Sequence, residues 1–319
     1  MRNDECEMRD GKWPGDVIER AAQLREQLRP QIDQFIREQR LPDSFHHLID
    51  DYYLPLAVWL AQKRVRGQPL VVGICGGQGS GKSTLTDFLR LAWAAMDLCS
   101  AGFSLDDIYL TRAERQRLAQ AVHPLLATRG VPGTHDVQLG LDTIEALCHG
   151  DSRSEVAIPS FDKSTDDRAP RARWPRLRGP VDILLFEGWC VGAQPWKDGA
   201  EPINALERQE DADGIWRDYI NTQLAGPYRA LFAQLDVLLM LKVPDMDSVL
   251  EWRRLQERKL CARTGGGMSD EELERFVQHY ERITRNLLTE MPARADCIFE
   301  LGRNHRICAM CLRRADDGR

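Results

Sequence analysis

One stretch of the sequence decides the fold, and it reads Gly76-Gly77-Gln78-Gly79-Ser80-Gly81-Lys82-Ser83. It fits the pattern G-x-x-x-x-G-K-[ST] at every position. The apolar run 70–75 before it is typical of a buried strand, and the run 83–96 after it is typical of a helix. Strand, glycine-rich loop and helix in this order predict a loop whose backbone N–H groups wrap a phosphate at the positive end of a helix.

The chemistry of such a loop assigns roles to its side chains. We expect Lys82 to contact the β- and γ-phosphates of a nucleotide, and the hydroxyl of Ser83 to bind Mg²⁺. The residues expected to bind the nucleotide are Gly76, Gly77, Gln78, Gly79, Ser80, Gly81, Lys82, Ser83 and Thr84. The loop alone does not say what happens to the bound phosphate.

Composition narrows the class of protein. The chain of 319 residues is 43% hydrophobic and 29% charged, an ordinary globular mixture. Its net charge of -6 argues against general nucleic-acid binding, and no apolar run reaches the ~18 residues of a membrane span. The acidic N-terminus resembles neither a signal nor a transit peptide, and nine scattered cysteines favour reduced thiols. We therefore expect a cytoplasmic protein; its oligomeric state is left open.

Strand and helix patterns alternate beyond the loop. This alternation predicts an α/β fold of the P-loop class, with a doubly wound, mainly parallel sheet. Expected strands cover 98–104, 156–159, 181–186, 235–243 and 297–301, and expected helices cover 137–148, 215–224, 245–261 and 269–290, with a loop at 166–180 and a turn at 265–267. Residues 1–66 are expected to form a helical extension, with one helix over 15–40, packed on a domain of residues 67–319.

Carboxylates follow two of the expected strands. Asp106 and Asp107 lie after the strand 98–104, and Glu187 ends the strand 181–186. Ligands in open parallel sheets collect at this edge, so Asp106 is our candidate for accepting a hydroxyl proton, with Asp107 as the fallback. Asp106 could instead cap a helix, or it could hydrogen-bond to a ligand of the metal ion without binding the ion itself. Glu187 is expected to support Mg²⁺, and the alternative is a strand-end acid without a metal role.

Longer motifs carry a family resemblance. Ser104-Leu105-Asp106-Asp107-Ile108-Tyr109 is similar to an element of the uridine kinase, phosphoribulokinase and pantothenate kinase group. A narrower series consists of 129–136 (RGVPGTHD), 159–164 (PSFDKS), 186–189 (FEGW), 251–257 (EWRRLQE) and 267–272 (GMSDEE). In this order the series resembles the D-glycerate 3-kinase family over residues 70–300. Ile108 and the Arg-rich loop after Asp167 depart from the family pattern.

The resemblance implies an enzyme that transfers the γ-phosphoryl group of ATP, with Mg²⁺, to the 3-hydroxyl of D-glycerate. One alternative is a kinase of the same group acting on a nucleoside or pantothenate, which needs a larger pocket. Another is a P-loop ATPase with a regulatory role and no small acceptor.

A site for glycerate needs a cation for its carboxylate and polar groups for its hydroxyls. Lys163 and Arg168 are the candidate cations, and His135 with Asp136 is expected to fix a hydroxyl. Tyr109 is expected to line the pocket. The alternatives are solvated surface cations and, for Asp136, a cap of the helix that follows.

Two further groups of residues need a role. Arg253, Arg254, Arg258, Lys259 and Arg263 are expected in a lid at about 250–272, with Arg254 as the candidate that stabilises the transferred phosphate. The alternative is a solvated helix. The group Cys297, His305, Cys308 and Cys311 could bind zinc, but its spacing favours a terminal strand.

Overall fold

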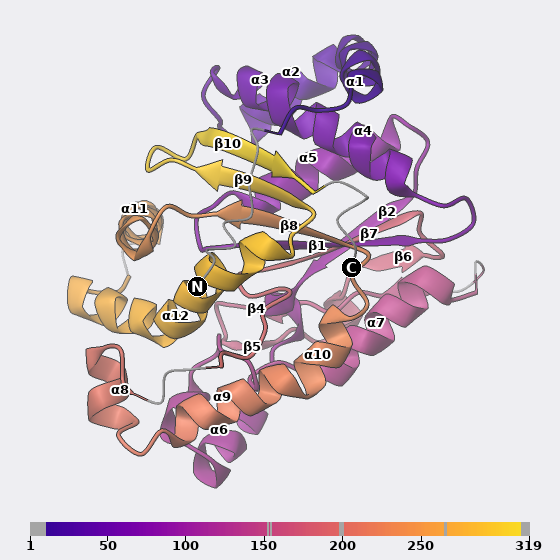
Figure 1. Cartoon of the computed structure of the whole chain (residues 1–319). Coiled ribbons are helices and arrows are strands. Elements are labelled where there is room, and N and C mark those ends of the chain that lie inside the picture. Colours follow the sequence, from indigo (N-terminus) through magenta and orange to yellow (C-terminus); the bar gives the residue numbers. More distant parts are fainter. Residues whose placement is uncertain (1–10, 152, 154, 198–200, 265–266, 314–319) are drawn as a thin grey trace, which may run out of the picture.

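The computed structural model of the chain describes residues 11–151, 153, 155–197, 201–264 and 267–313 (Figure 1). At its centre is a six-stranded sheet with the order β10-β9-β8-β1-β7-β2. The strands are β1 Leu70–Gly76, β2 Ser100–Ser104, β7 Ile183–Gly188, β8 Val237–Lys242, β9 Cys297–Leu301 and β10 Ile307–Leu312. Neighbouring strands are parallel except β10, which is antiparallel to β9. The predicted α/β fold with a mainly parallel sheet is confirmed.

Helices cover both faces of this sheet (Figure 1). Successive strand residues point to opposite faces, so Val72 and Ile74 of β1 enter one hydrophobic core while Val71 and Cys75 enter the other. The first core is closed by α4 and α5, the second by α7, α9, α10 and α12. The helices of the main domain are α5 Lys82–Ala94, α6 Arg112–Ala121, α7 Val137–His149, α8 Ala205–Glu210, α9 Ile215–Ala225, α10 Pro227–Phe232, α11 Met246–Thr264 and α12 Asp270–Glu290. None of the helices in the described ranges has the length and apolar character that a membrane span requires.

In the N-terminal region, two helices lie in the range 15–40, where one helix was predicted. The elements of this region are α1 Gly15–Gln27, α2 Arg29–Glu38, α3 Phe45–Leu48, the π-helical turn η1 Ile49–Tyr53 and α4 Leu54–Lys63. The single-helix prediction was wrong because Pro30, in the first turn of α2, has no N–H to donate to the preceding turn. The chain therefore bends at Leu28 and starts a second helix.

These N-terminal helices pack on α5, the helix that follows the phosphate loop. The rings of Phe35 and Tyr53 lie 5.5 and 5.7 Å from that of Phe88. The indole N–H of Trp93 donates to the carbonyl of Ala57 at 3.0 Å. Both regions thus share one core. The division into an extension of 1–66 and a domain of 67–319 stays a prediction.

Two short antiparallel ribbons lie outside the main sheet. β3 Glu155–Ala157 pairs with β6 Arg176–Arg178, and β4 Phe161–Asp162 pairs with β5 Asp167–Arg168. The strand expected at 156–159 therefore belongs to a ribbon, and the expected loop 166–180 contains β5, the turn η4 Arg171–Arg173 and β6. Prolines limit these strands because they cannot donate a ladder hydrogen bond.

Helix α12 begins and ends as the sequence indicates. The Ser269 hydroxyl accepts from the N–H of Glu272 at 3.2 Å, and the Glu272 carboxylate accepts from the N–H of Ser269 at 2.8 Å. This capping box starts the helix, which ends at Glu290. Gly265 and Gly266 of the turn expected before it lie outside the described residues. Shorter turns are η2 Leu105–Ile108, η3 Pro124–Ala127 and η5 Met291–Ala293.

The C-terminal cysteines lie on a hairpin. Cys297 is buried in β9, whereas Cys308 and Cys311 lie on β10 and His305 lies in the turn between the strands. Within the described ranges, no three His, Cys, Asp or Glu residues gather as metal ligands. The strand β10 accounts for the spacing of Cys308 and Cys311, and a strand here is what the sequence pattern favoured over a zinc site.

Candidate active site

Strand β1 places the phosphate loop at the carboxyl edge of the sheet. Gly79 and Gly81 have φ angles of 80° and 89°, a region that side chains rarely adopt. The ammonium of Lys82 donates to the carbonyl oxygens of Gly76 at 2.7 Å and Gly77 at 3.2 Å. The loop thus curves around the ammonium of its own lysine, which is the sign of charge that a phosphate requires.

The register of the sheet brings the candidate acids to the same edge. Ile74 of β1 lies beside Glu187 of β7, and Glu187 lies beside Ser104 at the end of β2. Asp106 and Asp107 follow directly in the turn η2. Three carboxylates therefore surround the point where β1 enters the phosphate loop.

The oxygen donors at this edge fit Mg²⁺. Mg²⁺ usually keeps several waters and takes one or two protein ligands besides phosphate oxygens. The side chain of Ser83 is exposed in the first turn of α5, and Glu187 is half-buried on β7. A hydroxyl and a carboxylate beside a phosphate loop suit an ion that arrives with a nucleotide, and these two roles stay predictions.

Asp106 is held by two donors from different segments. Its carboxylate accepts from the Lys163 ammonium at 2.7 Å and from the Tyr109 hydroxyl at 2.9 Å. Burial alone would raise the pKa of Asp106, but the charge and hydrogen bond of Lys163, with help from Tyr109, outweigh it and lower the pKa. Asp106 is therefore an oriented, ionised carboxylate whose basicity depends on where Lys163 points.

Asp107 has the opposite character. Its carboxylate accepts from the backbone N–H of Ser104 at 2.9 Å and closes the capping box of η2. Burial raises the pKa of Asp107 to about 6; backbone hydrogen bonds from Ser104 and Phe161 oppose this rise, while the charges of Asp106 and Glu187 add to it. Two adjacent acids thus have pKa values shifted in opposite directions, a pattern typical of functional sites.

The raised pKa of Asp107 makes folding stability depend on pH in a defined way. Because the folded pKa of about 6 lies above the ordinary value of 3.8, the native state binds more protons between these values. The contribution of Asp107 to stability therefore falls as pH rises from about 4 to 6. Asp107→Asn removes this loss and keeps an oxygen for the Ser104 N–H. We expect its Tm, relative to wild type, to rise by several degrees between pH 4.5 and 7.5.

Differential scanning fluorimetry at both pH values measures this shift. Asp213→Asn, at an exposed carboxylate in the turn before α9, is the control and should follow the wild type. A constant difference between Asp107→Asn and wild type at both pH values would contradict the prediction.

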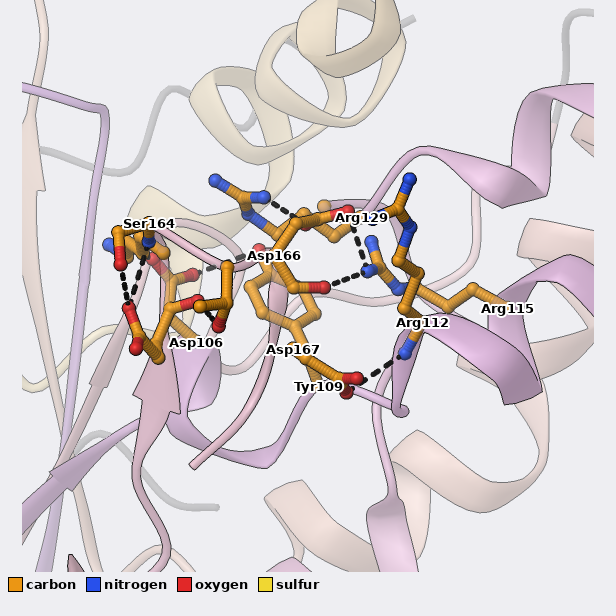
Figure 2. Close-up of polar contacts among 12 residues, drawn as sticks. Asp106, Tyr109, Arg112, Arg115, Arg129, Ser164, Asp166 and Asp167 are labelled. Atoms are coloured by element: carbon orange, nitrogen blue, oxygen red, sulfur yellow. Dashed lines mark hydrogen bonds and ion pairs between the residues drawn. The ribbon is translucent and has the colours of Figure 1, made fainter. Parts of the chain in front are cut away.

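The turn of the ribbon β4–β5 carries Lys163, which binds Asp106. Figure 2 shows Asp166 of the same turn beside Arg115 and Arg129. Beside Lys163, Asp166 adopts a left-handed φ of 55°. Its carboxylate accepts from Arg115 at 2.9 Å and also pairs with Arg129, and its carbonyl accepts from Arg115 at 2.7 Å. Arg115 is only 1% exposed. The buried guanidinium of Arg115 thus holds the ribbon in place. The Lys163 side chain is 63% exposed, so its position is not restricted by packing.

His135 lies next to Asp106 through Tyr109. The Tyr109 ring, whose hydroxyl binds Asp106, stacks on the imidazole with a centroid distance of 4.5 Å. Burial lowers the pKa of His135 to about 3, against the opposing charge of Asp106, so the ring is neutral.

The hydrogen bonds of His135 indicate which of its two ring nitrogens carries the hydrogen. The Tyr228 hydroxyl accepts from the backbone N–H of Gly133 at 2.9 Å and lies 2.5 Å from Nδ1 of His135. Because this hydroxyl accepts from Gly133, it can donate its own hydrogen to Nδ1, and the hydrogen of the neutral ring would then lie on Nε2. Nε2 is buried and has no hydrogen-bond partner among the described residues. Such a donor is expensive to bury and is suited to a bound oxygen atom.

Asp136 and Arg168 are engaged with each other. One oxygen of Asp136 caps α7 by accepting from the N–H of Leu139 at 3.0 Å, and the other pairs with Arg168 at 3.0 Å. Arg168 also donates to the carbonyl of Tyr109 at 2.9 Å. These contacts fix the loop around Tyr109; a direct substrate role for either residue stays a prediction.

Two of the lid arginines are engaged in ion pairs. Arg254 pairs with Glu274 of α12 at 2.6 Å, and Arg253 pairs with Glu257 on its own helix at 3.0 Å. Contact of Arg254 with phosphate therefore requires that it leave Glu274, and its role stays a prediction. The side chains of two further expected lid residues lie outside the description: Lys259 and Arg263.

Helix α11 lies directly against the phosphate loop. A Cβ atom added at Gly79 would lie 3.1 Å from Cβ of Trp252 and 3.3 Å from Nε2 of Gln256. Sequence reasoning missed Gln256, although its position one turn after Trp252 places the two on one helix face. It also missed Tyr228 and Asp166, whose distant partners leave no local signal.

Comparisons with known proteins agree with this geometry. No family model matches the chain. An uncharacterized kinase of Schizosaccharomyces pombe, mug58, is 38% identical over 69% of this chain and 81% of its own length. The chloroplastic D-glycerate 3-kinase of Arabidopsis thaliana is 32% identical over 72% of this chain, and the match spans 52% of the plant protein.

A solved structure shares the fold. The D-glycerate 3-kinase of Cryptococcus neoformans var. grubii superimposes with a TM-score of 0.65 and 26% identity, covering 82% of this chain and 96% of that one. Together with the phosphate loop and the acids beside it, these likenesses show that the chain belongs to the D-glycerate 3-kinase family of P-loop kinases.

Proposed function

We propose that this kinase transfers the γ-phosphoryl group of ATP to a hydroxyl of a small organic acid, and that the acid is D-glycerate. The observation that carries the proposal is the buried Nε2 of His135, which has no hydrogen-bond partner among the described residues. Its ring stacks on Tyr109, whose hydroxyl binds Asp106. A hydroxyl or carboxylate oxygen of the acceptor would satisfy Nε2. The names of the plant and fungal relatives favour D-glycerate among such acids.

An acidic acceptor also explains the contact between Lys163 and Asp106. Lys163 is exposed enough to turn toward a substrate carboxylate. Its departure would let the pKa of Asp106 rise, because Lys163 is what outweighs the effect of burial. Binding of the acid would thereby make Asp106 a better acceptor for the hydroxyl proton.

The proposed transfer step uses the carboxylate of Asp106 and the residues of the phosphate loop. The acceptor oxygen attacks the γ-phosphorus, the bond from the γ-phosphorus to the β,γ-bridging oxygen breaks, and the proton moves from the hydroxyl to Asp106. Lys82 leaves its loop carbonyls to neutralise charge on the β- and γ-phosphates. Ser83 and Glu187 would hold Mg²⁺ together with the nucleotide, and the bound ion would supply further charge neutralisation. Arg254 is the proposed lid cation, and Asp136 and Arg168 hold the acceptor loop in place.

A panel of acceptors tests the proposal. ADP release is measured by a coupled assay with D-glycerate, L-glycerate, uridine and pantothenate. We expect turnover with D-glycerate well above the rate without acceptor. Turnover of uridine or pantothenate with none of D-glycerate would overturn the substrate assignment, and a slow rate independent of every acceptor would indicate a regulatory ATPase.

His135→Phe tests the observation on which the proposal rests. Phenylalanine keeps the ring against Tyr109 and removes the Nε2–H. We expect the KM for D-glycerate to rise about 10-fold, the cost of about one hydrogen bond, with ATP affinity unchanged. Thermal unfolding establishes that the variant is folded, and an unchanged KM in a folded variant would remove His135 from the acceptor site.

A further inference from the structure

Lys163 lies at the start of the loop that joins β4 to β5. Asp162 pairs with Asp167 in the ribbon, so residues 163–166 form this loop, with Asp166 at its end. The Lys163 ammonium reaches the Asp106 carboxylate at 2.7 Å, although its side chain is 63% exposed. Because little packs against this side chain, the position of its ammonium depends on how the loop backbone is held.

Two arginines hold the end of the loop through Asp166. Arg115 of α6 donates to its Oδ2 at 2.9 Å, and Arg129, which follows η3, pairs with its Oδ1. Arg115 also donates to the backbone carbonyl of Asp166 at 2.7 Å. Since Arg115 is only 1% exposed, its charge needs a carboxylate nearby, and Asp166 supplies it. The loop is thus tied to a buried group by both its side chain and its backbone.

The same two arginines also flank the start of the loop. Their guanidinium carbons lie 5.8 Å (Arg115) and 5.5 Å (Arg129) from the ring centroid of Phe161, within the range of cation–π contact. The Phe161 ring in turn packs edge-on against Tyr109 at 5.2 Å, and the Tyr109 hydroxyl binds Asp106. Phe161 lies before the loop and Asp166 ends it, so the arginines hold both ends.

The backbone of Asp166 shows that its carboxylate is not needed for the turn itself. Its φ of 55° lies in the left-handed region, which glycine adopts at no steric cost. An aspartate there is less favourable and persists where its surroundings hold it. What the carboxylate adds at this position is the pair of contacts with Arg115 and Arg129.

We propose that Arg115, Asp166 and Arg129 are positioning residues for the acceptor: they hold the loop 163–166 so that the Lys163 ammonium meets the acceptor carboxylate beside Asp106. The three residues act through Lys163 and do not contact the acceptor themselves. The proposal rests on the proposed function, in which Lys163 turns from Asp106 to an acidic acceptor. A displaced loop weakens binding of the acceptor and leaves the phosphate loop, which follows β1, unchanged.

Asp166→Asn tests this role. Asparagine tolerates the left-handed backbone, but its amide has one acceptor oxygen, so one of the two arginines loses its partner. We expect the KM for D-glycerate to rise about 5- to 10-fold, the effect of about one hydrogen bond, with kcat and the KM for ATP close to wild type. Asp97→Asn is the matched control: Asp97 also has a φ of 55°, is exposed, and lies before β2 at the opposite edge of the sheet.

A double-mutant cycle shows whether Asp166 acts through Lys163. Lys163→Met removes the ammonium and should raise the KM for D-glycerate about 10- to 100-fold, the loss of a hydrogen bond to a charged group. Adding Asp166→Asn to Lys163→Met should then change this KM little, because the group that Asp166 positions is already gone. General damage to the site would instead multiply the two effects.

Two results would overturn the proposal: multiplied effects in the double variant, or a wild-type KM for D-glycerate in Asp166→Asn. Thermal unfolding establishes that each variant is folded. Arg129→Gln leaves the contact between Arg115 and Asp166 in place and should raise the same KM, so it provides the test if Asp166→Asn does not fold. Absence of turnover with D-glycerate in the wild type would overturn the proposed function itself.

Discussion

Asp106→Asn is expected to lower kcat with D-glycerate by about 10²- to 10⁴-fold while ATP still binds, the range for loss of a general base. The amide retains the shape of the carboxylate and an oxygen that can accept from Tyr109, so the turn η2 should stay in place. What it loses is a site for the hydroxyl proton and the charge that attracts Lys163. The coupled ADP assay and calorimetry with ATP measure the two effects separately.

A second carboxylate variant is the control in the same assay. Asp213→Asn, far from the phosphate loop in sequence and exposed, should turn over D-glycerate at the wild-type rate. If Asp106→Asn retained full kcat, Asp106 could not be the proton acceptor, and Asp107, whose pKa is raised to about 6, would become the candidate. A loss of ATP binding would instead place Asp106 in the nucleotide site.

Glu207→Ala is expected to lower the free energy of unfolding by about 3–5 kcal/mol, the cost of removing one partner of a buried ion pair. Glu207 on α8 is fully buried and accepts from Arg282 of α12 at 2.8 and 2.6 Å. It also lies 3.6 Å from Arg217 of α9. Removing this carboxylate thus takes an ion-pair partner from two buried guanidinium groups. Arg217 also pairs with Asp211, and Arg282 also donates to the carbonyl of Glu201 at 2.6 Å.

Urea unfolding followed by tryptophan fluorescence measures this loss. The control is Glu155→Gln, which breaks the exposed pairs with Arg176 and Arg178 at 3.9 and 3.8 Å and should change stability by less than about 1 kcal/mol. Equal small effects of the two variants would mean that solvent reaches the Glu207 cluster.

The sequence predicted the part of the site that is local. The strand, the phosphate loop and α5 are contiguous, and the capping box of α12 involves residues three apart. Periodicity also predicted each parallel strand, but it could not tell that 156–159 pairs in a ribbon, since pairing partners are not encoded locally. Pro30 indicates that a helix begins near it, but the apolar spacing on either side led to the prediction of one continuous helix.

The acceptor site depends on distant pairs and was less accessible to sequence reasoning. Lys163 meets Asp106 across 57 positions, and Nδ1 of His135 meets the hydroxyl of Tyr228 across 93 positions. The position of Arg254 on a helix could be predicted from the sequence pattern. Its ion-pair partner Glu274, 20 positions later on another helix, could not. These contacts follow from the packing of complete elements.

The packing of Phe35, Tyr53 and Ala57 against α5 has a practical consequence for anyone shortening this chain. A truncated version starting at residue 67 would hold every motif of the phosphotransfer centre, yet it would leave Phe88 and Trp93, both fully buried in the intact protein, facing water. Such a fragment is expected to aggregate, and domain swaps with related enzymes need to carry the N-terminal helices along with the nucleotide loop.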